Sequence, residues 1–419
     1  TYLLVSSALN SINSELEEMG EIQGAGKAMI LRKITLPLVL PAILSAVILT
    51  FSKAIGTFGT INYLGSPVQY YTLSSQLYMN INSRDTQTGF AMAILMIIIA
   101  SIAVFVNQKL IGSRKSYATI GGKGGRSTLI GLGKVGRPVI TAALFVFFAV
   151  GIIMPIVILV MESFMLKEGI YSLDNFTLHY WIGESNPQIM EGLPGIFKND
   201  EFINSLFNSL RLTLVNGVFG TIFGQLLGYI TAKGRGRLHG KLVEQLVFIP
   251  YLIPSVAFGG IYLSMFSQPQ QIFGVTLVPA LYGTFALLTL VSVVKHLPFA
   301  ARAGTSNMLQ ISGELEEAAT IEGAGFFRRF VKIVFPLSKG GFISGFMLIF
   351  VSIMKELDLI ILIMTPTTST LPYLAFRYQN GNSPQASDCV AIVMFSIVFL
   401  VYAIANLSGK ADLAKSMAG

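Results

Sequence analysis

Residues 314–337 read ELEEAATIEGAGFFRRFVKIVFPL, a charged segment set between two long apolar runs. A second copy lies upstream at residues 15–38 and reads ELEEMGEIQGAGKAMILRKITLPL. The copies are 299 positions apart and, aligned without a gap, share 12 of 24 residues. A repeat of this length and identity does not arise from composition alone, so it predicts that the chain is built from two related halves.

The copy at 314–337 predicts a short helix, a turn and then a return to an apolar run. Ser312 offers an N-cap, and the acidic Glu314 suits the positive end of a helix dipole. The Gly323-Ala324-Gly325 cluster ends the helix and lets the backbone turn. Pro336 opens the next apolar run, as proline does at a first helical position. These residues predict a docking helix outside the membrane that fits a groove on another protein; an ordinary amphipathic loop helix is the alternative.

The composition is that of an integral membrane protein. Hydrophobic residues make up 53% of the chain and charged residues 12%, against about 25% charged in a soluble domain. Long apolar runs of this kind predict an all-α protein whose helices cross a bilayer. One cysteine, Cys389, excludes an internal disulfide.

The apolar runs divide the chain into two halves joined by a linker. The first half, residues 1–111, holds the docking loop at 9–38, and the second half, residues 138–419, holds the docking loop at 306–337. The linker at 112–137 is Gly-rich and basic, which is typical of a cytoplasmic segment. The predicted spans are 38–63 and 89–110 in the first half, and 139–161, 204–232, 242–263, 278–297, 340–364 and 388–407 in the second.

The repeat also predicts that the first half is truncated at its N-terminus. Residue 139 opens the second half, and the offset of 299 puts its counterpart at −160. Roughly 160 residues carrying about four spans are therefore expected to precede Thr1, on this chain or on another one.

The basic residues predict the orientation of the chain in the membrane. Segments that we assign to the cytoplasm hold 22 of the 29 basic residues, as the positive-inside rule expects. The net charge of +8 is therefore explained without a nucleic-acid partner. Six spans lie between the docking loops, so both loops should face the cytoplasm in a parallel repeat. This favours a transporter driven from the cytoplasm; the alternative is a secondary transporter or channel, often built from inverted repeats.

No motif for nucleotide hydrolysis, metal binding or nucleophilic catalysis is evident in the sequence. No Gly-Lys pair is followed by Ser or Thr, so the chain lacks a P-loop and is not expected to hydrolyse ATP itself. His179, His239 and His296 lie on different segments, without the spacing of metal ligands. We therefore expect no enzyme activity, cofactor or metal on this chain.

Glu317-Ala318-Ala319, Gly323 and the segment Ile333-Val334-Phe335-Pro336 together resemble the EAA loop of ABC importer permeases. The family pattern ends I-x-L-P, and this copy has Phe335 at the Leu position, whereas Ile34-Thr35-Leu36-Pro37 is intact. The first copy departs from E-A-A at Glu18-Met19-Gly20. The resemblance implies the type I ABC importer transmembrane fold in two parallel repeats, with a coupling helix in each loop that sits in a cleft of an ATPase subunit.

The resemblance also implies which residues and partners couple the chain to ATP. The coupling residues would be Glu18, Gly24, Gly26, Pro37, Glu317, Ala318, Ala319, Gly323, Gly325 and Pro336. The partners would be two copies of an ABC ATPase, which bind ATP and Mg, an extracytoplasmic solute-binding protein that docks on 162–201 and 365–387, and membrane lipid. The location would be the inner membrane of a bacterium, which the chain crosses many times.

Polar residues inside predicted spans are candidates for the solute pathway or its gate, because they are costly in a membrane. Lys355, Glu356 and Asp358 form the clearest cluster; an internal ion pair or a position beyond the bilayer edge is the alternative. The corresponding place in the first half, residues 53–58, is chemically different. Pro250 and Pro254 interrupt another span, as a pathway hinge or as a structural kink.

Two fused halves in one chain resemble the permeases of ferric-iron importers. The stretch at 350–380 is similar to the segment after the second EAA loop of that group, especially at Met354-Lys355-Glu356-Leu357 and from Leu371-Pro372 to Tyr378. The resemblance therefore implies import of ferric iron. Phosphonate, thiamine, polyamine and sulfate are the alternatives, since specificity in this group rests largely with the external binding protein.

Overall fold

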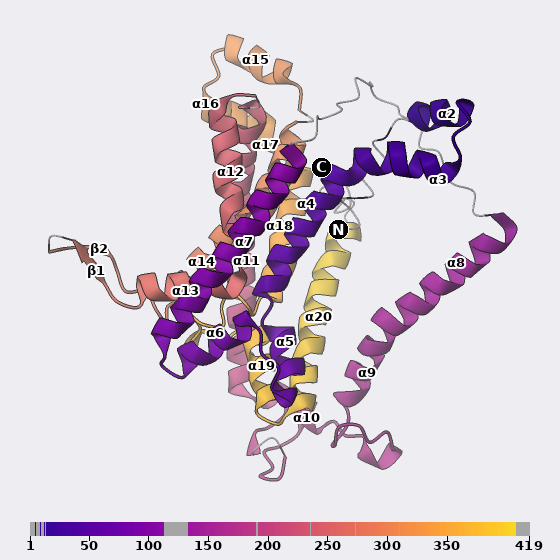
Figure 1. Cartoon of the computed structure of the whole chain (residues 1–419). Helices are drawn as coiled ribbons and strands as arrows, with labels where there is room; N and C mark the ends of the chain where they lie inside the picture. The colour runs from indigo at the N-terminus through magenta and orange to yellow at the C-terminus, as the bar shows by residue number, and fades with distance from the viewer. Residues whose placement is uncertain are drawn as a thin grey trace. The chain divides into compact units, whose positions relative to one another are not determined.

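The computed structural model describes residues 5, 9, 12, 14–112, 133–189, 192–234, 236–272, 274–309 and 311–407 (Figure 1). The regular secondary structure of this part of the chain is helical apart from an isolated bridge and one hairpin, in which β1 (Gln270–Ile272) pairs antiparallel with β2 (Val275–Val278). The all-α class predicted from the sequence is confirmed. Most of the predicted linker at 112–137 lies outside the described residues.

Contacts group the chain into two units, each described here by itself. The first unit comprises residues 1–54 and 98–158, and the second comprises residues 55–97 and 159–417. Residues 55–97 thus group with the second half of the sequence rather than with the first. The predicted halves and their boundaries stay a prediction.

The first unit begins with a docking loop and continues into long apolar helices. Its elements are α2 (Ser14–Ile22), α3 (Lys27–Ile30), the π-helix η1 (Leu31–Thr35), α4 (Leu36–Gly56), the second half of α7 (Thr86–Gly112), α8 (Gly133–Phe148), the π-helix η3 (Ala149–Ile153) and α9 (Met154–Glu162).

The second unit holds the remaining elements, including the second docking loop. They are α5 (Gly59–Gly65), η2 (Ser66–Val68), α6 (Leu73–Asn82), the start of α7, η4 (Leu173–Asn175), α10 (His179–Ile182), η6 (Ile196–Lys198), α11 (Asp200–Lys233), α12 (Leu238–Leu252), α13 (Ser255–Phe266), β1, β2, α14 (Phe285–Met308), α15 (Gly313–Ile321), α16 (Phe326–Arg329), the π-helix η7 (Phe330–Val334), α17 (Phe335–Leu337), α18 (Lys339–Met354), η8 (Pro366–Thr368), α19 (Leu371–Asn380) and α20 (Pro384–Leu407).

Five helices among the described residues are long and apolar enough to cross a membrane, and two bent pairs raise the number to seven if each pair is one span. The five are Thr86–Val106, Gly133–Glu162, Asp200–Lys233, Phe285–Met308 and Pro384–Leu407. The bent pairs are Leu238–Leu252 with Ser255–Phe266, and Phe326–Leu337 with Lys339–Met354. All but Thr86–Val106 correspond to the six spans predicted for the second half.

Three predicted spans have wrong bounds. The span at 340–364 stops early, because α18 ends at Met354 and the residues after it form turns closed by their own polar side chains. The span at 38–63 is broken between α4 and α5, where Gly56 lies against the backbone of Pro254. The span at 278–297 is shifted at both ends, because Val278 belongs to β2 and α14 starts after its N-cap, Thr284, and continues to Met308.

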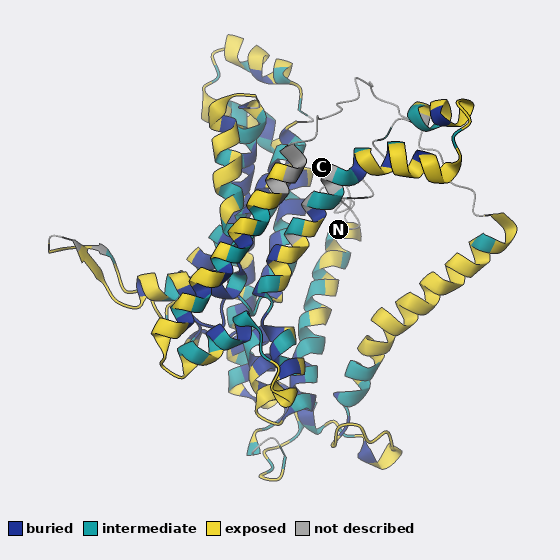
Figure 2. Ribbon diagram, in the orientation of Figure 1, coloured by how far each residue is buried: buried dark blue, intermediate teal, exposed yellow. Residues whose placement is uncertain are grey.

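The core of the second unit is α11 packed on α14 and α18, where the buried residues of Figure 2 are concentrated. A Cβ added to Gly224 would lie 2.7 Å from the carbonyl carbon of Ala300, and one added to Gly228 would lie 2.5 Å from the backbone nitrogen of Thr305. Residues four apart share one helix face, and small residues there let two helix backbones approach closely. The glycines of α11 therefore set the distance between α11 and α14.

We expect Gly224→Ala to lower the thermal unfolding temperature of the detergent-purified protein, because the added methyl group overlaps the α14 backbone. Overpacking of this kind costs about 1–3 kcal/mol. Gly340→Ala is the matched control, since an added Cβ at Gly340 of α18 meets nothing within 4 Å. Equal unfolding temperatures for the two variants would contradict the close approach of the helices.

Candidate functional site

The docking loop of the second unit is a short helix with defined caps at both ends. Ser312 Oγ accepts the backbone N–H of Glu314 at 3.3 Å and caps α15, as the sequence predicted. At the other end Gly323 has φ +79°, and the Ala324 N–H donates to the Ala319 carbonyl at 2.9 Å. This bond across five residues and the left-handed glycine form the usual C-terminal cap of a helix. The chain then turns into α16.

The first docking loop repeats this geometry element by element. The helix α2 and the π-helix η1 begin and end 299 residues before α15 and η7, respectively. Gly24 has φ +82°, and the Ala25 N–H donates to the Gly20 carbonyl at 3.0 Å, which is the same cap as in the second loop. Gly26 and Gly325 both have extended backbone before the next helix. The identical glycines of the two sequences therefore produce identical turns.

Glu316 fixes α15 to the end of α11. Its carboxylate is buried, accepts a hydrogen bond from Tyr229 Oη at 2.7 Å, and lies 2.6 Å from Lys233 Nζ. Tyr229 and Lys233 are one turn apart near the C-terminus of α11. Sequence analysis missed Glu316 because the helical turn that buries it depends on α11, 87 residues earlier. Its counterpart in the first unit, Glu17, accepts a hydrogen bond from Thr35 at 2.5 Å.

The charge of Glu316 is stabilised by its neighbours. Burial opposes its ionisation, but hydrogen bonds from Lys233 and Tyr229 and the charges of Lys233 and Arg329 outweigh burial, so the pKa of Glu316 lies below its usual value of 4.5. Arg329 also donates to Thr320 Oγ1 at 2.5 Å, which ties α16 back to α15. The loop is therefore held in one conformation by charge-assisted bonds, which are stronger than neutral ones.

The predicted coupling residues line the outer side of both loops. Glu317 and Ala318 are exposed, Ala319 is half-buried, and Glu18 is exposed. Gly20, which stands where the E-A-A pattern has its second Ala, is buried, and an added Cβ there would lie 3.0 Å from Ile34 Cδ1. The remaining predicted residues, Gly24, Gly26, Pro37, Gly323, Gly325 and Pro336, form the turns and the starts of the following helices.

The structure does not bring Lys355, Glu356 and Asp358 together as one cluster. Lys355 is exposed at the C-terminal end of α18. Glu356 Oε2 lies 3.3 Å from His296 Nε2 of α14. Asp358 instead accepts the backbone N–H of Gly59 at the start of α5, at 2.9 Å. The three side chains, although close in sequence, thus lie in three different environments: the surface, α14 and α5.

Pro254, and not Pro250, marks the break in the proline-rich span. Pro250 lies inside α12, whereas α12 and α13 meet at Ile253 and Pro254 with a bend of 98°. The break frees backbone carbonyls, and the buried Lys295 of α14 donates to two of them: Pro250, at 2.9 Å, and Ile253. The ammonium group therefore caps the C-terminal end of α12, where the helix dipole favours a positive charge.

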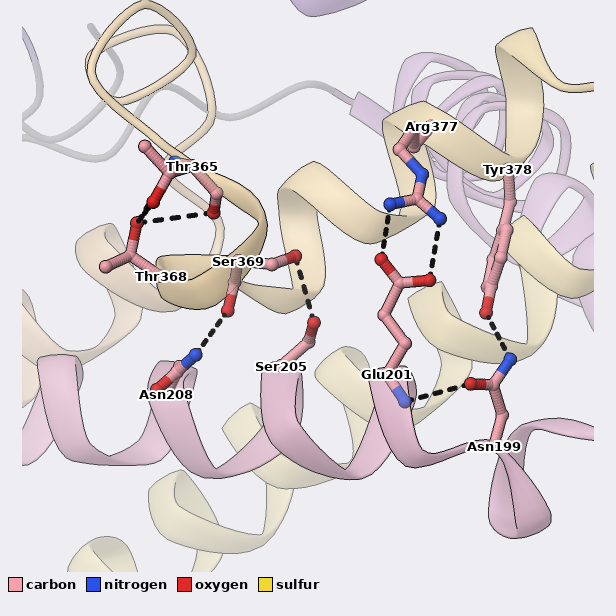
Figure 3. Close-up of polar contacts among 9 residues, drawn as sticks. All are labelled: Asn199, Glu201, Ser205, Asn208, Thr365, Thr368, Ser369, Arg377 and Tyr378. Atoms are coloured by element: carbon pink, nitrogen blue, oxygen red, sulfur yellow. Dashed lines mark hydrogen bonds and ion pairs between the residues drawn. The ribbon is translucent and has the colours of Figure 1, made fainter. Parts of the chain in front are cut away.

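The N-terminal end of α11 is tied to the segment around α19 by a row of polar contacts (Figure 3). Ser205 Oγ donates to Ser369 Oγ at 3.0 Å, and Asn208 Nδ2 donates to the Ser369 carbonyl at 2.9 Å. Arg377 and Glu201 form a bidentate ion pair. We call these contacts the outer clamp. The same helix, α11, thus carries the docking loop at one end and the outer clamp at the other.

The chain belongs to the family of binding-protein-dependent transport system inner membrane components, whose model matches residues 1–117 and 220–411. Each matched segment contains one docking loop. Membership confirms the predicted resemblance to this class of permease component and the location as a multi-pass protein of the inner membrane.

Two of its relatives are named for different solutes. The ferric transport system permease protein FbpB of Actinobacillus pleuropneumoniae is 22% identical over 100% of this chain and 58% of that protein. The sulfate transport system permease protein CysT of Synechocystis sp. is 26% identical over 48% of this chain and 71% of that protein. The chain therefore spans about three fifths of the length of its ferric relative.

A solved structure supports the fold. It is that of a bacterial ABC transporter involved in the import of the acidic polysaccharide alginate, and it matches with a TM-score of 0.51 at 16% identity, over 64% of this chain and 94% of that chain. Identity this low supports the fold alone. The fold agrees with the ABC importer transmembrane class predicted from the sequence.

We expect Glu316→Gln to loosen α15 from α11 while leaving the rest of the second unit folded. A hydrogen bond to a charged group contributes about 1.5–3 kcal/mol, so amide exchange in Gly313–Ile321 should be at least about tenfold faster. Exchange by mass spectrometry measures it, and the exposed neighbour in Glu317→Gln is the matched control. Equal exchange in the two variants would show that Glu316 does not hold the loop.

The ionised Glu316 contact also predicts how amide exchange in α15 depends on pH. Since folding lowers the pKa of Glu316, its contribution is complete above the unfolded value of 4.5 and is lost as the pH falls through the lower folded value. Exchange in Gly313–Ile321 should therefore keep its intrinsic pH dependence from pH 7 down to pH 5 and show extra opening only below about pH 4.5. Glu316→Gln should remove this extra step.

Proposed function

We propose that the chain is the transmembrane permease subunit of an ATP-driven ABC importer. Membership in a family of inner membrane components of binding-protein-dependent transport systems supports the transport role. The observation that carries the ATP-driven part is the duplicated docking loop, with the same helix, glycine cap and π-helix at an offset of 299 residues. Two equal docking helices suit two equal partners, as a pair of ATPase subunits would provide.

The free side of α15 has the chemistry of a docking surface. Ile321 exposes 86% of its area and lies one helical turn from the exposed acidic Glu317 on the same face. Apolar and acidic groups on a short helix that is anchored on its other side fit a groove in a partner. In this function the partner ATPase binds ATP and Mg and hydrolyses ATP, and the permease itself is not an enzyme.

Anchoring at Glu316 would pass movement of the ATPase to the membrane helices. A partner that displaces α15 acts on Tyr229 and Lys233, and so on the C-terminal end of α11. We propose that closure of two ATPase subunits on ATP moves both docking loops and switches the helices from inward-open to outward-open. An extracytoplasmic solute-binding protein would then deliver the solute on the other side, at 162–201 and 365–387.

We propose ferric iron as the solute. Two permeases named for ferric transport align with 100% and 93% of this chain. Permeases named for sulfate and for molybdate or tungstate each align with 48%. The longer alignments favour the ferric group. Sulfate, phosphonate, thiamine and polyamine remain the alternative solutes.

Purification of the tagged protein from native membranes tests the ATP-driven function. We expect an ABC ATPase to co-purify with the wild-type chain and solute-stimulated ATPase activity to follow on reconstitution. Glu317→Lys, which reverses a charge on the docking side, and Gly323→Pro, which a φ of +79° does not allow, should each reduce both signals at least tenfold. Membrane insertion should be unchanged.

Lys198→Glu is the matched control for these variants. Lys198 is exposed and pairs with Glu184 before the start of α11, far along the chain from the docking loop. Its charge reversal should leave ATPase co-purification at the wild-type level. Uptake by the wild-type protein with no ATPase bound would instead identify a secondary transporter or channel.

A further inference from the structure

Residues that are equivalent in the two repeats touch one another in the second unit. Gly59 and Asp358 are 299 residues apart, which is the offset of the docking loops, and they are joined by the hydrogen bond from the Gly59 N–H to Asp358 Oδ1. Phe58 and Leu357, at the same offset, lie in one apolar cluster. Contacts between equivalents therefore lie just after the helix that follows each docking loop, which is α4, ending at Gly56, or α18, ending at Met354.

A second set of equivalents meets at α6 and α19. Both helices have ten residues and start 298 positions apart, each after a threonine N-cap, Thr72 or Thr370. Arg84 and Asn382 follow them at the same offset and both have positive φ. By this alignment Tyr78 is equivalent to Phe376, and the two rings meet edge to face with centroids 6.0 Å apart.

The aromatic ring of Phe376 is enclosed by rings of the first repeat. Its centroid lies 5.4 Å from that of Phe58 and 5.7 Å from that of Tyr63, in addition to the contact with Tyr78. Phe376 is 4% exposed and Phe58 is fully buried. We call Phe58, Tyr63, Tyr78 and Phe376 the aromatic plug.

Contacts between equivalents locate the symmetry axis of the repeat. When two copies are related by a twofold axis, a residue meets its own equivalent only where the axis passes, as in any isologous interface. In parallel membrane repeats this axis runs along the membrane normal, which is the direction in which a solute must travel. The aromatic plug and the Gly59–Asp358 bond therefore lie across a path along the axis.

The plug lies at the end of the second unit that is remote from the docking loop. The Leu371 N–H at the start of α19 donates to Ser209 Oγ of α11 at 2.7 Å, whereas α15 is held by Tyr229 of the same helix. Twenty residues of α11 separate the two attachment points, or about 30 Å, which is the thickness of the hydrocarbon core of a bilayer.

We propose that the aromatic plug is the closed outer gate of the solute path, with Phe376 as the side chain that blocks the axis. This rests on the proposed transport function and adds the gate residues to it. Phe376 belongs to α19, which the outer clamp fixes to α11, while the other three rings come from the first repeat. Opening therefore requires the two repeats to separate at this point, which withdraws Phe376 from between the other rings.

A leak assay on the full chain alone tests the block without a partner or a known solute. In liposomes that contain calcein, we expect the wild-type protein to exclude external Co²⁺, and Phe376→Ala to admit it at least tenfold faster. Phe395→Ala is the control, because Phe395 is a 52% exposed aromatic on α20; it should stay closed. Tight liposomes with a monodisperse Phe376→Ala protein would overturn the gate.

A cysteine cross-link tests the movement and does not depend on the stability of the alanine variant. Tyr78→Cys with Phe376→Cys joins the two repeats, whereas Phe395→Cys with Phe399→Cys, whose native rings are 6.2 Å apart on α20 and outside the plug, joins positions within one repeat. The single native cysteine, Cys389, is buried and is left in place. A short bis-methanethiosulfonate, which joins two thiols through disulfide bonds that a reductant cleaves, should link both pairs.

Only the link between repeats should abolish uptake of ferric iron by the reconstituted complex, and reductant should restore it. If no cross-link forms between positions 78 and 376, or if both cross-linked proteins take up iron equally, the proposal that the aromatic plug is the outer gate is wrong. Loss of ATPase binding by the wild-type chain would refute the proposed ATP-driven function and leave the leak and cross-link results standing. The two failures are therefore distinguishable.

Discussion

The close backbone approach of α11 and α14 at Gly224 and Gly228 is the constraint on which the second unit depends. It makes α11, a helix of 34 residues and thus about 50 Å in length, part of a rigid layer with α14 and α18. The docking loop attaches at its C-terminal end through Lys233, and the outer clamp attaches at its N-terminal end through Glu201. One long helix therefore links the docking loop to the outer clamp.

Charged side chains buried beside this layer find polar partners where neighbouring helices break or end. The ammonium group of Lys295 donates hydrogen bonds to the carbonyls freed at Pro254. It thereby takes the place of the backbone N–H donors that are missing there. His296 Nδ1 lies 2.9 Å from the Ser292 carbonyl, and His296 Nε2 lies 3.3 Å from Glu356 Oε2. Polar partners of this kind lower the cost of burying polar groups.

The sequence was sufficient for features that depend on local residues and failed where distant contacts decide. The two docking loops were predictable because the same serine or glycine chemistry produces the same caps wherever it occurs, as at Gly24 and Gly323. The role of Glu316 was not, because nothing in its own helix indicates that α11 covers it. The side chains after Met354 were expected to act together, yet their neighbours lie on α14 and α5, and these pairings exist only in the folded chain.

The π-helices η1 and η7 follow the docking helices at equivalent positions of the two loops. A π-turn contains one residue more than an α-turn, and each residue of an α-helix corresponds to about 100° of rotation. When a segment changes from π-helix to α-helix, its backbone hydrogen bonds shift by one residue. The chain on one side of the segment then rotates relative to the chain on the other side. A change of this kind at η1 or η7 would rotate the turn and the docking helix that precede it relative to the membrane helix that follows.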